Sequence, residues 1–247
     1  MCPQDGRRDA LAALVTTTDI LEKLDLETTT LWDFPFQSPP KMPFGDAAFN
    51  GVAPSRLVWN LVVRFTRKGD WVVDPMAGSG TTLDVARSLG RRVLGFDLSP
   101  RRRDIHRADA RDLPLPSDFA PLVFLDPPYG DNLCYSNDPR CLGALTCDSD
   151  AFYDELCGVA SEVKRILRTG GVSAWLISDQ YRDSRFTPVG FSLFSLLRNL
   201  FEPVDIIAVS RRNDRSLNPH WRHWSRRANF FLRGFKYLLI FRKGGVP

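Results

Sequence analysis

Apolar residues follow two kinds of pattern along the 247-residue chain. Short continuous apolar runs are typical of buried strands, and apolar residues that recur every three or four positions are typical of helices with one buried face. The runs predict seven strands, at 71–74, 92–96, around 105, 122–125, 172–177, 204–209 and 237–241. The spaced residues predict helices that begin near Ser55 and after Thr82, and two more at 152–166 and 191–199.

The order of these elements predicts the fold class. Alternation of strands and helices favours a three-layer α/β structure, in which a seven-stranded, mostly parallel sheet carries helices on both faces. The last two predicted strands have no predicted helix between them, so we expect the last strand to be antiparallel. Gly170-Gly171 is expected to end the helix at 152–166. A weaker helical pattern at 10–24 and a proline-rich loop at 34–49 precede these elements, and the length favours a single domain over 1–247.

A glycine-containing segment, 75–82, connects the first predicted strand to a helix. Glycines in this position allow a ligand to approach the backbone closely, as in nucleotide-binding sites. The segment lacks the third glycine of the dinucleotide motif, because Leu83 occupies that place, and it lacks the Gly-Lys-Ser/Thr of phosphate-binding loops. A cofactor with an adenosine but no phosphates therefore fits better. Asp97, at the end of the next strand, has the spacing of a ribose-binding acid, and the alternative is a turn residue before Ser99-Pro100.

The tetrapeptide Asp126-Pro127-Pro128-Tyr129 follows the apolar run 122–125. Asp126 is able to accept hydrogen bonds from an amino group, the prolines stiffen the turn, and Tyr129 offers a flat face for stacking. This combination suits a planar base with an exocyclic amino group. The alternative is an ordinary turn at the end of a strand, because Asp-Pro is common turn chemistry.

Together these segments resemble the motifs of S-adenosylmethionine-dependent DNA amino-methyltransferases of the N4-cytosine/N6-adenine group. The matching segments are 28–35, 53–55, 74–82, 95–97, 108–110, 126–129 and 229–237. The resemblance implies a Rossmann-like class I methyltransferase fold. It also implies that Asp74, Gly78 and Gly80 surround the methionine part of the cofactor, that Asp97 binds its ribose, and that Asp109 with Ala110 contacts its adenine. The same pocket would include Pro75, Met76, Ala77, Ser79, Thr81, Thr82 and Leu98.

By the same resemblance, an N-terminal segment, 1–54, would close over the cofactor, with Thr29, Thr30 and Ser55 among the closing residues. The implied reaction is direct transfer of a methyl group to the exocyclic nitrogen of a flipped base. Asp126 and a carbonyl near Pro127 would accept the amino hydrogens, and Tyr129 would stack on the ring. Aspartate at the first position occurs in both the N4-cytosine and the N6-adenine enzymes, so the base stays open. The chain has no Pro-Cys pair of the kind that cytosine-carbon methylation uses.

Three insertions are candidates for reading double-stranded DNA: 130–150, 179–190 and 211–233. The last combines basic and aromatic residues, which suits phosphate contacts and base stacking. Its candidate DNA-binding residues are Arg211, Arg212, Arg215, Trp221, Arg222, Trp224, Arg226 and Arg227. The alternative is a solvated basic hairpin with its aromatics folded onto the core. The run Arg101–Arg103 is either a further phosphate-binding patch or a solvated run.

The net charge of +4 and the pI of about 8.9 are compatible with a polyanionic partner. No separate target-recognition domain is visible in the sequence, so a homodimer partner would be one way to extend the recognised site. A cognate restriction enzyme is compatible with the family, although no sequence feature indicates one. Two other functions remain open: an RNA guanine-N2 methyltransferase, which shares the Asp-Pro-Pro-Tyr motif, and a nucleic-acid-binding module without activity.

Five cysteines without C-x-x-C spacing predict reduced thiols and a cytoplasmic protein, and no metal site is expected. The sequence shows no apolar stretch of about 20 residues and no signal-peptide pattern, which predicts a soluble protein.

Overall fold

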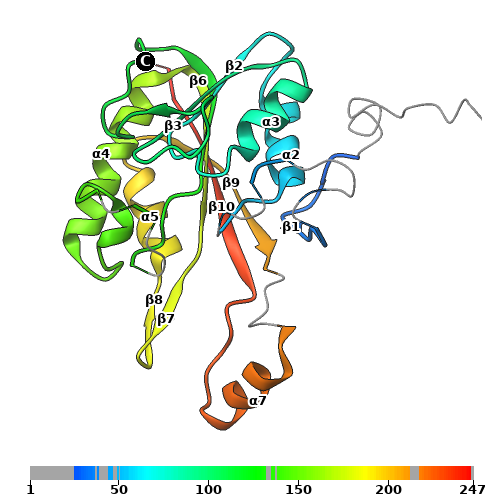
Figure 1. Cartoon of the computed structure of the whole chain (residues 1–247), viewed down its shortest axis with the longest axis vertical. Helices are drawn as coiled ribbons and strands as arrows, with labels where there is room; N and C mark the ends of the chain where they lie inside the picture. The colour runs from blue at the N-terminus through cyan, green and yellow to red at the C-terminus, as the bar shows by residue number, and fades with distance from the viewer. Residues whose placement is uncertain are drawn as a thin grey trace, which may run out of the picture.

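A computed structural model describes residues 25–36, 38, 44–46, 49, 51–131, 135–136, 138–211 and 217–245. Within these ranges, eight strands form one sheet in the order β1-β9-β10-β6-β5-β2-β3-β4, with helices on both faces (Figure 1). The helical pattern at 10–24 and half of the proline-rich loop at 34–49 lie outside the described residues. The mostly parallel α/β fold class is confirmed.

The centre of the sheet consists of parallel strands. β5 (Ala120–Leu125) pairs with β2 (Trp71–Asp74) on one side and with β6 (Leu167–Ile177) on the other. β3 (Arg92–Asp97) and the short β4 (His106–Arg107) complete this half. All six residues of β5 are buried, because helices cover both faces of the sheet there. A continuous apolar run is therefore the expected pattern for this strand.

The other half of the sheet contains the antiparallel strand. β10 (Phe235–Arg242) lies between β6 and β9 (Glu202–Ser210) and is antiparallel to both. The predicted antiparallel pairing of the last two strands is confirmed. The predicted absence of a helix between them is wrong, because α7 (Pro219–Arg227) lies there. This helix projects away from the sheet, so the chain still returns beside β9 (Figure 1).

The predicted number of seven strands is also wrong. The additional strand is β1 (Leu31–Trp32), which pairs parallel with β9 and buries the Trp32 ring. Two residues with one buried side chain give no recognisable alternation, so the sequence pattern does not reveal this strand.

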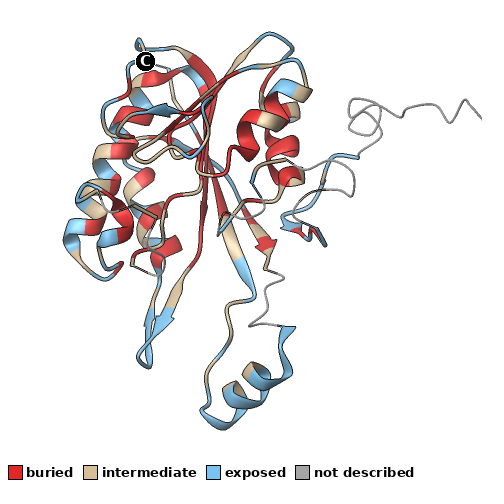
Figure 2. Ribbon diagram, in the orientation of Figure 1, coloured by how far each residue is buried: buried red, intermediate tan, exposed pale blue. Residues whose placement is uncertain are grey.

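Helices pack on the two faces of the sheet in pairs. α2 (Ser55–Phe65) and α3 (Thr81–Ser88) bury their apolar residues on one face. α4 (Asp150–Ile166) and α5 (Val189–Leu197) bury theirs on the other. Figure 2 shows the buried residues concentrated between these helix pairs and the central strands. The four predicted helices are confirmed.

The predicted role of Gly170-Gly171 is wrong. Helix α4 ends at Ile166, and β6 begins at the next residue, Leu167, whose backbone is already extended. Gly170 lies three residues further on, with a φ of +75°, and its amide donates to the Lys243 carbonyl at 2.9 Å. The glycines therefore shape the irregular start of the strand, where a left-handed φ favours glycine.

The remaining small elements lie beyond the carboxyl ends of the parallel strands. They are the 3-10 helix η1 (Leu142–Ala144), the hairpin of β7 (Gln180–Arg182) and β8 (Arg185–Thr187), and α7. In Figure 1 the hairpin and α7 extend from the same end of the molecule. Open α/β sheets bind their ligands at this edge.

Candidate active site

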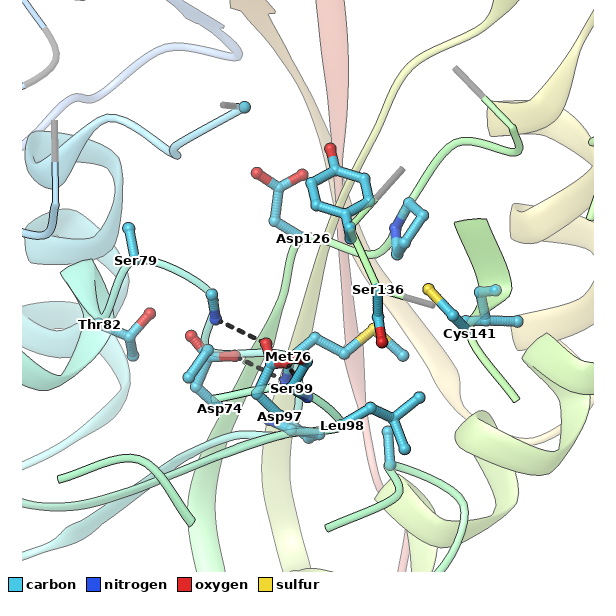
Figure 3. A pocket seen from close by; sticks show the side chains of 18 of the residues that line it. Asp74, Met76, Ser79, Thr82, Asp97, Leu98, Ser99, Asp126, Ser136 and Cys141 are labelled. Atoms are coloured by element: carbon cyan, nitrogen blue, oxygen red, sulfur yellow. Dashed lines mark hydrogen bonds between the residues drawn. The ribbon is translucent and has the colours of Figure 1, made fainter. Parts of the chain in front are cut away.

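A cavity opens at the carboxyl ends of β2, β3 and β5. The carboxylates of Asp74, Asp97 and Asp126, one from the end of each strand, line the same space (Figure 3). Tyr135 and Cys141 lie in its wall as well. The three parallel strands converge on this space because they leave the sheet at one edge. The fold thus brings together three segments that are far apart in the sequence.

The glycine segment forms one side of the cavity. It makes a tight turn between β2 and α3, in which Gly78 and Gly80 have φ of +44° and +81°. The Gly80 amide donates to the Ala77 carbonyl at 2.7 Å and closes the turn. A Cβ at Gly78 would lie 3.0 Å from the Phe49 ring, so the ring packs directly on the backbone. The lining residues from this segment are Asp74, Pro75, Met76, Ala77, Gly78, Ser79, Thr81 and Thr82.

Asp97 connects the glycine segment to the next strand. Its Oδ2 accepts a hydrogen bond from the Gly78 amide at 3.1 Å, and its Oδ1 accepts one from the Ser99 amide at 2.8 Å. Each carboxylate oxygen can accept more than one hydrogen bond, so Asp97 retains acceptor capacity toward the cavity. Leu98 and Ser99 also line the cavity.

Asp109 and Ala110 lie in the wall next to β4. Burial alone would raise the pKa of Asp109, but hydrogen bonds from the Arg111 backbone and guanidinium outweigh it and lower the pKa. Arg111 also contacts Glu155 of α4. The arginine is therefore occupied by two carboxylates, and Asp109 stays charged near neutral pH.

Asp74 is in a different electrostatic environment. Burial raises the pKa of Asp74 to about 7, and the nearby charges of Asp126 and Asp97 add to this, although hydrogen bonds from Thr82 and Met76 oppose it. The Met76 amide donates to Oδ1 at 3.1 Å. A positively charged ligand in the cavity would favour the carboxylate form of this group.

Asp126, the acid of the tetrapeptide, lies in the cavity wall, close to the residues that were predicted to bind the cofactor. Asp126 and Pro128 line the cavity, while the Tyr129 hydroxyl donates to Asp126 Oδ1 at 2.6 Å. Pro127 is buried between them. Lys236 of β10 also reaches this group, with Nζ 3.6 Å from Asp126 Oδ2. The turn thus aims a buried carboxylate into the cavity.

Comparisons with known proteins agree with this geometry. The profile of a family described as DNA methylase matches residues 4–107. Over 44 residues, 18% of the chain, the sequence is 46% identical to the type II methyltransferase M2.DpnII of Streptococcus pneumoniae. Over 52 residues, 21% of the chain, it is 36% identical to the type II methyltransferase M.MthZI of Methanothermobacter thermautotrophicus. Residues 4–107 of the chain thus resemble the N4-cytosine/N6-adenine DNA methylases. The matches span 16% and 15% of the lengths of these two relatives.

Solved structures share the fold of this chain. TrmN from Thermus thermophilus aligns with a TM-score of 0.52 at 20% identity, over 78% of this chain and 50% of that one. The [4+2]-cyclase SpnF aligns with a TM-score of 0.51 at 18% identity, over 78% and 82% of the two chains. A cyclase among these neighbours shows that the fold alone does not specify the reaction.

Several residues that the family resemblance placed at the cofactor lie elsewhere. Thr29 and Thr30 run beside β9, where the Thr30 carbonyl accepts from the Ala208 amide at 2.8 Å. This is the β1 edge of the sheet, which β9, β10 and β6 separate from β5. Ser55 is buried at the start of α2, next to Ala53, which does line the cavity.

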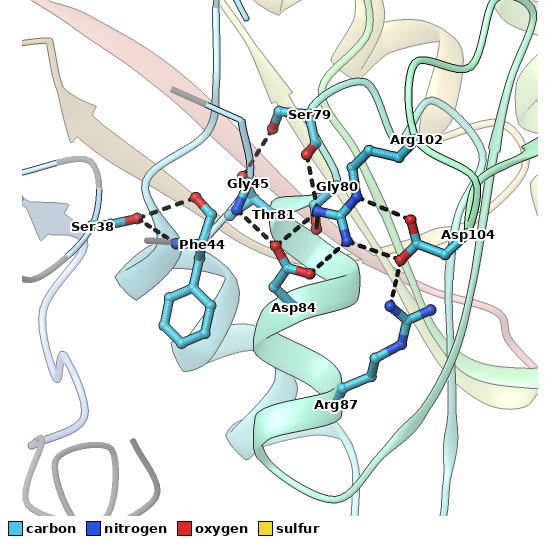
Figure 4. A network of polar contacts seen from close by, with 10 residues as sticks. All are labelled: Ser38, Phe44, Gly45, Ser79, Gly80, Thr81, Asp84, Arg87, Arg102 and Asp104. Carbon is cyan, nitrogen blue, oxygen red and sulfur yellow. Dashed lines mark hydrogen bonds and ion pairs between the residues drawn. The ribbon is translucent and has the colours of Figure 1, made fainter. Parts of the chain in front are cut away.

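The N-terminal segment reaches the cavity through its last part. Phe49, Gly51, Val52 and Ala53 line the cavity. A network around Arg102 holds the neighbouring residues against the glycine segment (Figure 4). The Arg102 guanidinium binds Asp84 at 2.7 Å, and Asp84 Oδ2 accepts from the Gly45 amide at 2.8 Å. Arg102 is thus part of an internal network, which corrects both earlier interpretations of the run Arg101–Arg103 for this residue.

Sequence reasoning missed several lining residues. Phe49, Tyr135, Ser136, Arg140, Cys141 and Leu142 all line the cavity. Tyr135, Ser136 and Arg140 lie in irregular segments, where no periodic pattern marks the side chains that face inward. Lys236 lies in a strand whose pattern is apolar, and a charged residue at that position is a signal that sequence reasoning could have used.

The candidate DNA-binding residues are divided between two places. Arg211 lies at the end of β9 near Tyr129 and Lys236, where its guanidinium donates to the Ser178 hydroxyl at 3.4 Å. Arg212 and Arg215 lie outside the described residues. The other five are on α7, whose residues are all at least partly exposed: Trp221, Arg222, Trp224, Arg226 and Arg227. One of the two interpretations of this insertion was a solvated basic hairpin. That interpretation is wrong, because these five residues lie on a helix.

The hairpin β7–β8 contacts the chain that follows α7. The Tyr181 and Phe230 rings stack with centroids 5.5 Å apart, and the Arg233 guanidinium lies 5.2 Å from the centre of the Phe186 ring. The hairpin of the second predicted insertion, 179–190, therefore lies beside residues 230–233 of the third. In the first insertion, residues 130–150, Leu142 and Cys147 are buried in the core.

Among the described residues, no group of three or more His, Cys, Asp or Glu side chains is arranged to hold a metal ion. In the same part of the chain, no helix has the length and apolar character needed to cross a membrane. Cys141, Cys147 and Cys157 are free thiols.

Proposed function

We propose that this chain transfers a methyl group from S-adenosylmethionine to an exocyclic amino nitrogen of a base in DNA. The observation that carries the proposal is the position of Asp126 in the wall of the cavity that Asp74 and Asp97 line. A methyl donor bound by Asp74 and Asp97 and a base amino group bound by Asp126 would then lie in the same cavity. Holding the two reactants together supplies proximity and orientation for the transfer.

The chemistry of the cavity fits the cofactor. Besides Asp126, three aspartates line it, Asp74, Asp97 and Asp109, and the glycine segment brings no lysine or arginine to bind phosphates. S-adenosylmethionine supplies an electrophilic methyl group on a positively charged sulfur. Asp97 would accept hydrogen bonds from ribose hydroxyls, and Asp74 with the Gly78–Gly80 turn would hold the cationic methionine end. Asp109 and Ala110 would contact the adenine.

The tetrapeptide would hold the target base. The amino nitrogen of adenine or cytosine is a poor nucleophile, because its lone pair is delocalised into the ring. A carboxylate at Asp126 that accepts its hydrogens favours a more tetrahedral nitrogen and stabilises the positive charge that develops during attack. A base in a duplex has to leave the stack to reach this position, and Tyr129 would then stack on it.

The family match favours DNA over the two alternatives, an RNA guanine-N2 methyltransferase and an inactive binding module. The decisive experiment is single-molecule sequencing of DNA from a methylation-free host that expresses the protein. It reports the base, its position and the sequence context together. Unmodified DNA together with methyl transfer to RNA in vitro would support the RNA enzyme, and failure to bind S-adenosylmethionine would support the inactive module. A homodimer and a cognate restriction enzyme stay predictions.

The α7 helix is the proposed contact to the DNA backbone. Replacing Arg222, Arg226 and Arg227 together with alanine should weaken duplex binding and lower the slope of log Kd against log salt concentration by about 2–3, because each lost phosphate contact contributes about 0.9. A filter-binding titration at several salt concentrations measures this slope. The matched control replaces Arg67, Arg92 and Arg168, which are exposed at the opposite, amino-terminal edge of the sheet. An equal change in both triple variants would exclude α7 as the specific contact.

Cofactor binding should depend on pH through Asp74. Because the pKa of Asp74 is raised to about 7, the group is protonated below this pH, and binding a cation then requires it to lose a proton. The affinity for S-adenosylmethionine should therefore fall by about five- to tenfold from pH 8 to pH 6. Calorimetric titrations of the wild type and Asp74→Asn isolate this effect, since the ligand's own amino group titrates equally in both. Parallel pH curves for the two proteins would contradict the assignment.

A further inference from the structure

A buried lysine lies beside the acid of the tetrapeptide. The side chains of Lys236 and Asp126 are 13% and 14% exposed, and Nζ lies 3.6 Å from Oδ2. The same ammonium lies 5.0 Å from the centre of the Tyr129 ring, over its face. Lys236 comes from β10, the antiparallel strand, whereas Asp126 and Tyr129 follow β5. The contact therefore joins two strands that β6 separates in the sheet.

The two oxygens of Asp126 have different partners in this arrangement. Oδ1 accepts the neutral hydroxyl of Tyr129 at 2.6 Å, and Oδ2 faces the ammonium of Lys236. The lysine thus brings a full positive charge to the carboxylate at this distance. A lysine with so little exposure near the start of a strand is costly unless it is paired, so the pair indicates a specific use.

Other charged and titratable groups face the pair from the neighbouring elements. The Arg211 guanidinium, at the end of β9, attracts Asp126 and repels Lys236. Asp74 from β2 lies on the cavity side, and its negative charge and that of Asp126 repel each other. The phenol of Tyr135 lies near Asp126 as well. Burial raises the pKa of Asp126 and lowers that of Lys236, and the charge of each partner opposes the shift of the other.

We propose that Lys236 is the counter-ion that holds Asp126 as a carboxylate in the methyl-transfer site. This role rests on the proposed function, since it is the carboxylate form of Asp126 that accepts the amino hydrogens of the base. Lys236 is then a positioning residue that acts through Asp126. It determines the pH above which methyl transfer becomes fast, because a nearby positive charge favours ionisation of a buried acid.

The test is the pH profile of methyl transfer, measured at saturating S-adenosylmethionine with tritiated methyl groups. In Lys236→Met, the acidic limb should move up by about one pH unit or more, so the rate at a fixed pH on that limb falls by about tenfold and recovers at higher pH. Lys236→Arg keeps the positive charge and should keep the limb at the wild-type pH. The matched control is Lys243→Met, which removes a similarly buried lysine whose Nζ pairs with Asp118 at 2.7 Å away from the cavity. This control should leave the profile in place.

Two results would overturn the proposal. An equal loss of rate at every pH in Lys236→Met would indicate a purely structural lysine. A faster reaction in that variant would indicate that the ammonium blocks Asp126 instead of ionising it.

A second measurement needs no activity and separates this proposal from the proposed function. Lys236→Met removes the paired charge beside a largely buried carboxylate, so its Tm should fall by roughly 5–10 °C at pH 8 and much less at low pH, where Asp126 is protonated. Adding Asp126→Asn should restore the Tm at pH 8. If the wild type transfers no methyl group to DNA but this restoration occurs, the proposed function is wrong and the ion pair stands. Without restoration, the ion pair itself is refuted.

Discussion

Replacing Asp126 with asparagine should reduce methyl transfer by about a thousandfold or more while cofactor binding and the fold persist. The amide has nearly the same size, but it has no negative charge and presents hydrogen-bond donors where the base amino group needs acceptors. Hydrogen bonds to charged groups contribute about 1.5–3 kcal/mol each, and the proposed site loses the charged acceptor of the base amino group and, with it, the charge that stabilises the transition state. Transfer of tritiated methyl groups to duplex DNA measures the loss.

Asp179→Asn is the matched control for this variant. Asp179 also follows a sheet strand and also accepts a tyrosine hydroxyl, from Tyr237 at 3.1 Å, but it lies outside the set of residues that line the cavity. Its replacement should lower thermal stability more than rate. Activity of Asp126→Asn within about tenfold of the wild type would remove Asp126 from the mechanism.

The second large effect is expected at Asp97. Replacing it with alanine should weaken S-adenosylmethionine binding by about a hundredfold, because the carboxylate both faces the proposed ribose position and holds the Gly78 and Ser99 amides. The glycine turn then loses the acceptor that fixes its backbone toward the cavity. Isothermal titration calorimetry gives the affinity directly.

Tyr129→Ala provides the contrast to Asp97→Ala. The Tyr129 side chain binds Asp126 and is assigned to the base, so this variant should keep cofactor affinity close to that of the wild type. Its turnover should fall by about 5- to 150-fold, because stacking on a flipped base contributes about 1–3 kcal/mol. Equal losses of cofactor affinity in the two variants would refute the division between a cofactor half and a base half.

Predictions from local sequence were accurate where a pattern repeats over many residues. The run at 122–125 and the spacing of Phe152, Leu156 and Val163 identify β5 and α4, because buried strands and one-sided helices impose these periods. They failed where an element is short or depends on a distant partner. β1 contains two residues and exists through its pairing with β9, and α7 lacks a buried face that would produce a period.

In the candidate site, too, residues with local sequence signals were predicted and residues that depend on distant contacts were not. Asp74, Asp97 and Asp126 could be found from the sequence, since each directly follows an apolar strand and the chemistry of each segment is local. Thr29 and Thr30 were assigned through the family resemblance alone, and they lie at the far edge of the sheet. Lining residues such as Tyr135 and Cys141 come from irregular segments, in which sequence position does not fix side-chain direction.

By itself, the sequence determined the alternating fold, the glycine turn without a phosphate-binding lysine, and the acid and aromatic ring of the tetrapeptide. These features depend on residues that are neighbours along the chain. Only the tertiary structure decided that Lys236 faces Asp126 and that Arg102 ties the N-terminal segment to the glycine turn. In both cases the partners come from different elements, and which of them meet depends on the order of strands in the sheet and the packing of helices on it. The charge state of the acid at the centre of the site therefore depends on a strand more than 100 residues away in sequence.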